Sequence, residues 1–133
     1  MKILALDLGD KHTGIAISDA LKMLARPYKT IDADNLYSEL EKIFSQENIE
    51  AVVIGYPKTL RDTKSEQTIK VENIKKELEN KFKEINWVFW DERLTSKSAQ
   101  QLKRPKDKSS KLETHAIAAA IILSSYLDSV SQY

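Results

Sequence analysis

The first third of the chain consists of short apolar runs separated by polar loops, and this pattern predicts three strands. Residues 3–8 are apolar except for Asp7, and residues 14–18 form a second run after a short loop. A loop of that length favours an antiparallel hairpin. A third short strand is expected around residues 28–31, after Pro27.

A helix and a buried strand are expected next. From residue 36 onward the apolar side chains recur at helical spacing, and Asp34 or Asn35 can serve as the N-cap. Residues 51–55 then form a continuous apolar run that ends at Gly55. Such a run is typical of a strand that is buried on both faces of a parallel sheet.

The rest of the chain alternates between helical and strand patterns. A capping box at Thr63 and Glu66 begins a second helix, an aromatic strand follows it, and residues 96–102 predict a short helix. Ser110 and Glu113 form another capping box before a long final helix. A hairpin followed by alternating units predicts an α/β fold, in which a mixed sheet carries helices on its faces.

Composition and charge narrow the class of protein. A chain of 133 residues, 41% of them hydrophobic, is expected to form a single domain over residues 1–133. There is no cysteine, so disulfides, thiolate nucleophiles and cysteine-bound zinc are excluded. No apolar run is long enough for a membrane span or a secretory signal, so we expect a cytoplasmic protein without a membrane partner. The net charge of +1 neither favours nor excludes a nucleic-acid partner.

The first candidate site is Asp7, the only charged residue in an apolar strand. A carboxylate among aliphatic side chains is costly unless a metal, a set of hydrogen bonds or a ligand compensates it. Gly9 and Gly14 follow, and glycine lets the backbone turn sharply or approach a ligand. The alternative is that Asp7 caps the turn after its strand.

Further acidic residues and a histidine are expected at the same edge of the sheet. Asp91 and Glu92 end the aromatic strand, and His115 lies early in the final helix. Strand-end carboxylates gather at one edge of an open α/β sheet and suit a divalent cation such as Mg²⁺. Alternatively, Asp91 and Glu92 form a solvated strand exit, and His115 is a core-edge residue bonded to the backbone.

Basic residues near these acids suggest contacts to phosphate. Lys11 and Arg93 adjoin the acidic motifs. The segment 103–111 holds five basic residues, which would attract phosphates in a salt-dependent way or form a solvated loop. Its candidate contacts are Lys103, Arg104, Lys106 and Lys108. Trp87 and Trp90 lie inside a strand, so we expect them in the core rather than stacked on bases.

Four segments in order resemble the YqgF/RuvX family, whose members are described as Holliday junction resolvases and as nucleases of ribosomal RNA precursors. They are residues 7–19, 52–57, 91–96 and 118–127, and together they extend over nearly the whole chain. The resemblance implies a ribonuclease H-like fold with a five-stranded mixed sheet whose second strand is antiparallel. It also implies a metal-dependent nuclease that acts on structured RNA or branched DNA, with Mg²⁺ or Mn²⁺ as the cofactor.

The resemblance also assigns roles to individual residues. Asp7 becomes the first metal ligand, and Asp91 or Glu92 becomes the strand-end acid. Glu92 is slightly favoured, because Asp91 is closer to the aromatic strand and can instead hold the turn. His115 stands where the family usually has Asp. An imidazole there could ligate a metal, with a preference for Mn²⁺ over Mg²⁺, or act as a general base, or mark a weakened site.

Three classes of function therefore compete. A metal-dependent phosphodiesterase acting on a ribosomal RNA precursor is the leading hypothesis, with branched DNA as the other substrate. An actin-like ATPase or sugar kinase also begins with a strand, an Asp and glycines, but it needs two domains. A non-catalytic module that binds nucleic acid or ribosomal precursor particles is the third. The sequence leaves open a monomer or a homodimer.

Overall fold

The computed structural model describes residues 1–56, 66–91 and 111–130, with side chains from Thr114 onward in the last segment. The strands are β1 (Lys2–Leu8), β2 (His12–Ser18), β3 (Ala25–Asp32), β4 (Ile49–Tyr56) and β5 (Asn86–Asp91). The helices are the 3₁₀ turn η1 (Ala33–Asn35), α1 (Leu36–Gln46), α2 (Glu66–Lys81) and α4 (Lys111–Val130). None of the helices within these ranges is long and apolar enough to cross a membrane.

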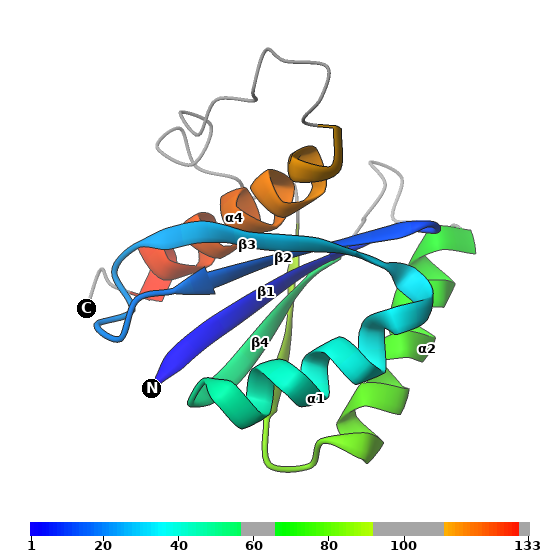
Figure 1. The fold of residues 1–133 in the computed structure, drawn as a ribbon, viewed down its shortest axis with the longest axis horizontal. Coiled ribbons are helices and arrows are strands. Elements are labelled where there is room, and N and C mark those ends of the chain that lie inside the picture. The colour runs from blue at the N-terminus through cyan, green and yellow to red at the C-terminus, as the bar shows by residue number, and fades with distance from the viewer. Residues whose placement is uncertain (57–65, 92–110, 131–133) are drawn as a thin grey trace.

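The strands form one mixed sheet in the order β3-β2-β1-β4-β5 (Figure 1). β2 is antiparallel to both β1 and β3, whereas β4 is parallel to β1 and β5 is parallel to β4. This topology confirms the predicted five-stranded sheet with an antiparallel second strand. Because β1 and β4 are parallel neighbours, their carboxyl ends meet at one edge of the sheet.

Helices cover both faces of the sheet. α1 and α2 pack on one face, and α4 crosses the other (Figure 1). Successive side chains of β1 point alternately to the two faces of the sheet. Those of Leu4, Leu6 and Leu8 pack toward α1 and α2, and those of Ile3 and Ala5 pack toward α4. Asp7 continues the second series, so its side chain belongs to the α4 face.

The boundaries of some elements differ from the prediction. β3 begins at Ala25 rather than near residue 28, because it pairs with the whole of β2 from His12 to Ser18. Asn35 is the N-cap of α1 by position, but its side chain makes no capping hydrogen bond. Thr63, the helix at 96–102 and the basic segment lie outside the described residues.

The two tryptophans are partly buried and pack against the core, in line with the prediction. Trp87 packs with the layer of α1 and α2, and Trp90 packs with the layer of α4. The indole Nε1 of Trp90 donates a hydrogen bond to Ser125 Oγ at 3.1 Å. Their aromatic faces are therefore occupied by protein contacts.

Candidate functional site

Asp7 lies near the carboxyl end of β1, directly opposite Gly14 of β2. Burial raises the pKa of the Asp7 carboxyl above its ordinary value, and the nearby positive charge of His115 partly opposes that rise. The strand is buried because its other side chains are aliphatic and covered by helices on both faces. Asp7 is thus a half-buried carboxylate that the protein alone compensates poorly.

α4 brings His115 to Asp7 by packing its first turns against β2 and β3. A Cβ atom added to Gly14 would lie 1.8 Å from the carbonyl oxygen of His115. The backbone N–H of Ala116 donates to Thr30 Oγ1 at 3.2 Å, which anchors the same turn to β3. Gly14 has no positive φ, so this glycine serves close helix packing rather than a turn.

A second histidine completes a polar cluster that the sequence analysis did not assign. The rings of His12 and His115 lie 5.5 Å apart between their centroids, at an angle of 33°. His12 Nε2 also lies 3.8 Å from Asp32 Oδ1. The only sequence signal for His12 was its place inside the 7–19 motif. Its contact with His115 depends on how α4 crosses β2, and no local pattern encodes that.

The loop between β1 and β2 is held by α2. Gln67 Nε2 donates to the carbonyl oxygen of Leu8 at 3.1 Å, and Lys70 Nζ lies 3.1 Å from Asp10 Oδ1. Lys11, the predicted phosphate contact, is exposed on this loop. It lines a hollow of about 460 Å³ together with His12 and four other residues. They are Asp10, Asp32, Asp34 and Asn35.

Asp91, at the end of β5, belongs to the opposite face of the sheet. Phe89 packs toward α1 and α2, whereas Trp90 packs against Ser125 of α4. Because side chains alternate along a strand, the side chain of Asp91 lies on the same face of the sheet as that of Phe89. Asp7 lies on the other face. The other predicted residues lie outside the described ranges: Glu92, Arg93, Lys103, Arg104, Lys106 and Lys108.

The donors at Asp7 suit a divalent cation. Within residues 1–56, 66–91 and 111–130, no hydrogen bond to the Asp7 carboxylate is found, and the imidazole of His115 is close enough to act on it electrostatically. A carboxylate and an imidazole are ligands that Mn²⁺ and similar cations accept. The same ranges contain no group of three acidic or histidine side chains close enough to hold an ion. Asp7 and His115 therefore fit two positions of a metal site that needs a further ligand.

Comparison with known proteins places the chain in a family. The sequence profile of RuvX, described as Holliday junction resolvase, matches residues 1–129. The chain belongs to the RuvX family. Two relatives named "Putative pre-16S rRNA nuclease" match along nearly their whole length. The one from Caldicellulosiruptor saccharolyticus is 39% identical over 98% of this chain and 99% of its own. The one from Clostridium tetani is 41% identical over 98% of both.

Solved structures confirm the ribonuclease H-like resolvase fold. The structure described as T. thermophilus RuvC in complex with Holliday junction substrate has a TM-score of 0.63 at 15% identity, and the match covers 99% of this chain and 96% of the other. The fowlpox virus resolvase, also in a complex with Holliday junction DNA, has a TM-score of 0.52 at 15% identity, with 98% and 99% coverage. Family and fold are those of nucleic-acid hydrolases.

Proposed function

We propose that this RuvX protein is a metal-dependent endonuclease of structured nucleic acid and that its substrate is the 5′ end of a 16S ribosomal RNA precursor. The observation that carries the proposal is the half-buried, raised-pKa carboxylate of Asp7 beside the imidazole of His115. The pair lies at the sheet edge where parallel strands end, and open α/β sheets bind their ligands at that edge.

Asp7, His115 and Glu92 are the proposed metal ligands. Asp91 belongs to the other face of the sheet from Asp7, so Glu92, the next acid in the sequence, is the proposed strand-end ligand. A divalent cation bound there would act as a Lewis acid and stabilise negative charge on the phosphate undergoing attack. His115 has a second possible role as the general base that takes a proton from the attacking water.

Basic side chains are proposed to hold the phosphodiester backbone. Lys11 is exposed on the loop that follows Asp7, and Arg93 follows Glu92 in the sequence. Lys103, Arg104, Lys106 and Lys108 supply a basic segment between β5 and α4. Such contacts add affinity without sequence specificity, and they weaken as salt rises.

The proposed substrate is the one for which the relatives are named. Branched DNA is the second candidate, because the family is described as Holliday junction resolvase. A binding module without cleavage is the third, because His115 replaces the acid that the resemblance leads one to expect at this position. We place the activity in the cytoplasm, where ribosomal precursors of bacteria are processed.

The test compares cleavage of two substrates by the purified chain. One is an RNA that spans the 5′ end of a 16S precursor, and the other is a four-way DNA junction. Each is incubated with Mg²⁺, with Mn²⁺ or with a chelator. Metal-dependent cutting of the RNA supports the proposal, and cutting of the junction alone would assign the second substrate. Salt-dependent binding of either substrate without cutting under any metal would contradict a nuclease.

A further inference from the structure

Polar side chains from three neighbouring strands share the sheet face that α4 covers, at the edge where Asp7 lies. Asp7 pairs with Gly14, which packs against the backbone of His115. His12 lies two residues before Gly14 on β2, and Asp32 is its register partner on β3. Residues two apart along a strand, and residues that pair across strands, lie on one face of a sheet. The fold therefore brings Asp7, His12 and Asp32 to the face on which the first turns of α4 pack.

The imidazole of His12 has two polar neighbours on this face. Its ring lies 5.5 Å from that of His115 between centroids, within the range in which aromatic rings pack against one another. Its Nε2 atom lies 3.8 Å from Asp32 Oδ1, and its side chain is 34% exposed. Next to this pair, the backbone N–H of Ala33 donates to the carbonyl oxygen of Lys11 at 2.9 Å. His12 therefore projects from a backbone that is hydrogen-bonded to β3, and its ring has a defined place.

The backbone of His115 is fixed by its contacts, but its ring needs a separate restraint. The carbonyl oxygen of His115 lies against Gly14, and the N–H of the next residue, Ala116, donates to Thr30 Oγ1 at 3.2 Å. These contacts place the Cα atom of His115 and do not restrain its two side-chain torsions. Within residues 1–56, 66–91 and 111–130, no hydrogen bond to the His115 imidazole is found, and its ring contact is with His12. The ring of His12 is thus placed to limit rotation of the His115 imidazole.

We propose that His12 is a positioning residue, whose ring holds the imidazole of His115 in one orientation beside Asp7. The proposal rests on the proposed function in one respect, namely that His115 is a metal ligand. His12 acts through its contact with His115 and not as a ligand itself, because the described residues contain no group of three acidic or histidine side chains that could hold an ion. Replacing a residue that orients a metal ligand typically lowers metal affinity by about ten- to a hundredfold.

The orientation of His115 can be measured without metal and without substrate. Three-bond NMR couplings of the His115 side chain, in isotopically labelled full-length protein, report whether its first torsion keeps one staggered rotamer or averages over several. In chelator, the wild type and His12→Phe should show one rotamer, because both place a ring against His115. His12→Ala should show averaged couplings. A single rotamer of His115 in folded His12→Ala would overturn the proposal, whether or not the protein cleaves RNA.

Binding of Mn²⁺ alone, followed by the loss of the EPR signal of the free ion, gives a second readout. His12→Ala should bind Mn²⁺ about tenfold or more weakly than the wild type. His12→Phe should bind it about as tightly as the wild type, because the ring contact with His115 is kept. Binding of the RNA in chelator should be the same in all three proteins, since His12 affects the reaction only through His115.

Two other results would give His12 a different role and overturn the proposal. Rescue of Mn²⁺ binding by His12→Gln, but not by His12→Phe, would show that a hydrogen bond from the Nε2 position matters and that the ring contact does not. Weaker RNA binding by His12→Ala in chelator, with the rotamer of His115 unchanged, would make His12 a contact to the substrate.

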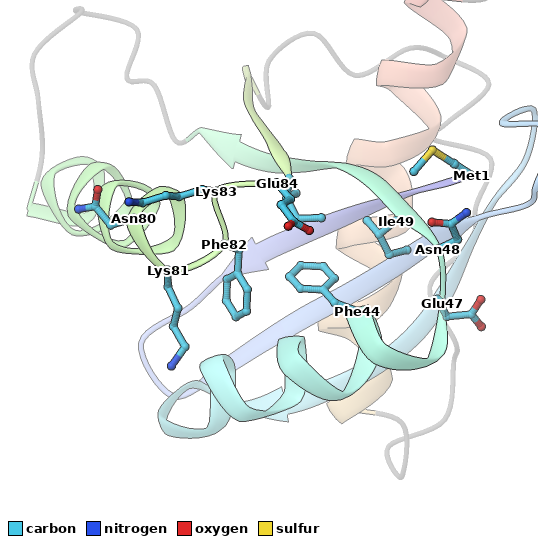
Figure 2. Close-up of a pocket in the computed structure, with 11 residues that line it drawn as sticks. Met1, Phe44, Glu47, Asn48, Ile49, Asn80, Lys81, Phe82, Lys83 and Glu84 are labelled. Carbon is cyan, nitrogen blue, oxygen red and sulfur yellow. The ribbon is translucent and has the colours of Figure 1, made fainter.

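The matched control comes from a hollow at the opposite end of the sheet. This hollow is bounded by the ends of α1 and α2 and by the starts of β4 and β5 (Figure 2). Glu84 lines it and is exposed, so Glu84→Ala truncates a side chain far from His115. That variant should leave the His115 rotamer and the Mn²⁺ affinity unchanged, while circular dichroism shows that every variant is folded. A wild type that binds no Mn²⁺ would contradict the proposed metal site, and the rotamer comparison would still decide the role of His12.

Discussion

The backbone of His115 rests directly on Gly14, so closely that a Cβ atom on Gly14 would lie 1.8 Å from the His115 carbonyl oxygen. Gly14 is also the residue that pairs with Asp7 across β1 and β2. One position without a side chain therefore sets how near α4 can bring its imidazole to the buried carboxylate. In this way the packing of a helix on a sheet defines the spacing of the candidate metal ligands.

Gly14→Ala should displace the first turns of α4 and separate His115 from Asp7. The added methyl group would meet backbone atoms, which cannot rotate away as a side chain can. We expect a loss of at least about 2 kcal/mol in the free energy of unfolding, together with a loss of cleavage. Urea denaturation and the cleavage assay measure the two effects. Unchanged stability would show that α4 lies farther from β2 than described.

Asp7→Asn should leave the fold intact and raise its melting temperature, or leave it unchanged, when metal is absent. The pKa of Asp7 is raised in the folded state, so the native protein binds more protons there than the unfolded chain does. Ionisation of Asp7 therefore removes stability as pH rises from the ordinary value of 3.8 through the raised one. Thermal melts in chelator at several pH values test this. The difference in melting temperature between Asp7→Asn and the wild type should grow as pH rises through that window and vanish below it.

A fall in the melting temperature of Asp7→Asn at neutral pH would contradict this account of the carboxylate. It would mean that the ionised group has a stabilising partner in the protein. Glu84→Gln is a suitable control for both melts and activity, because Glu84 is exposed just before the start of β5, at the end of the sheet away from Asp7.

His115→Asp should keep or raise cleavage supported by Mg²⁺. A second carboxylate supplies the oxygen ligand and the negative charge that Mg²⁺ prefers, whereas an imidazole suits Mn²⁺ and other transition metals. Rates with each metal for wild type, His115→Asp and His115→Ala give the comparison. A folded His115→Asp with lower activity in both metals would count against a simple ligand role and favour the general-base role.

Replacing Lys103, Arg104, Lys106 and Lys108 with alanine should weaken substrate binding and reduce its dependence on salt. For each phosphate that the protein no longer neutralises, the slope of log affinity against log salt falls by about 0.9 on duplex DNA and about 0.7 on single strands. Binding titrations at several salt concentrations measure that slope. An unchanged slope would identify the segment as a solvated loop.

Much of the fold follows from local sequence patterns. Three local patterns each specify one element with little influence from distant parts of the chain. They are the aliphatic run that contains Asp7, the continuous apolar run at 51–55 and the helical spacing after residue 36. β3 was predicted too short because Ala25 and Arg26 acquire strand structure by pairing with Ser18 and Ile17. Pairing of that kind is a tertiary effect, and local propensity does not report it.

The candidate site was predictable only in part. Asp7 was expected at the ligand-binding edge of the sheet, because open α/β sheets bind ligands at the carboxyl ends of their strands. The position of His115 early in the final helix was consistent with a place near Asp7. The contact of His12 with His115 depends on how α4 crosses β2, which follows from the missing side chain at Gly14. The sequence analysis expected Gly14 to serve a turn or a ligand, and its role in helix packing emerges only when both elements are placed.

Cleavage of the RNA precursor end by wild type, Asp7→Asn and Glu84→Gln, with Mn²⁺ and with chelator, tests the central claim most directly. The account predicts metal-dependent cutting by wild type and Glu84→Gln. It also predicts that Asp7→Asn, although folded and able to bind the RNA, loses activity by a factor of about a thousand or more. Cutting by Asp7→Asn at the wild-type rate would contradict the assignment of Asp7 as the group around which the site is built.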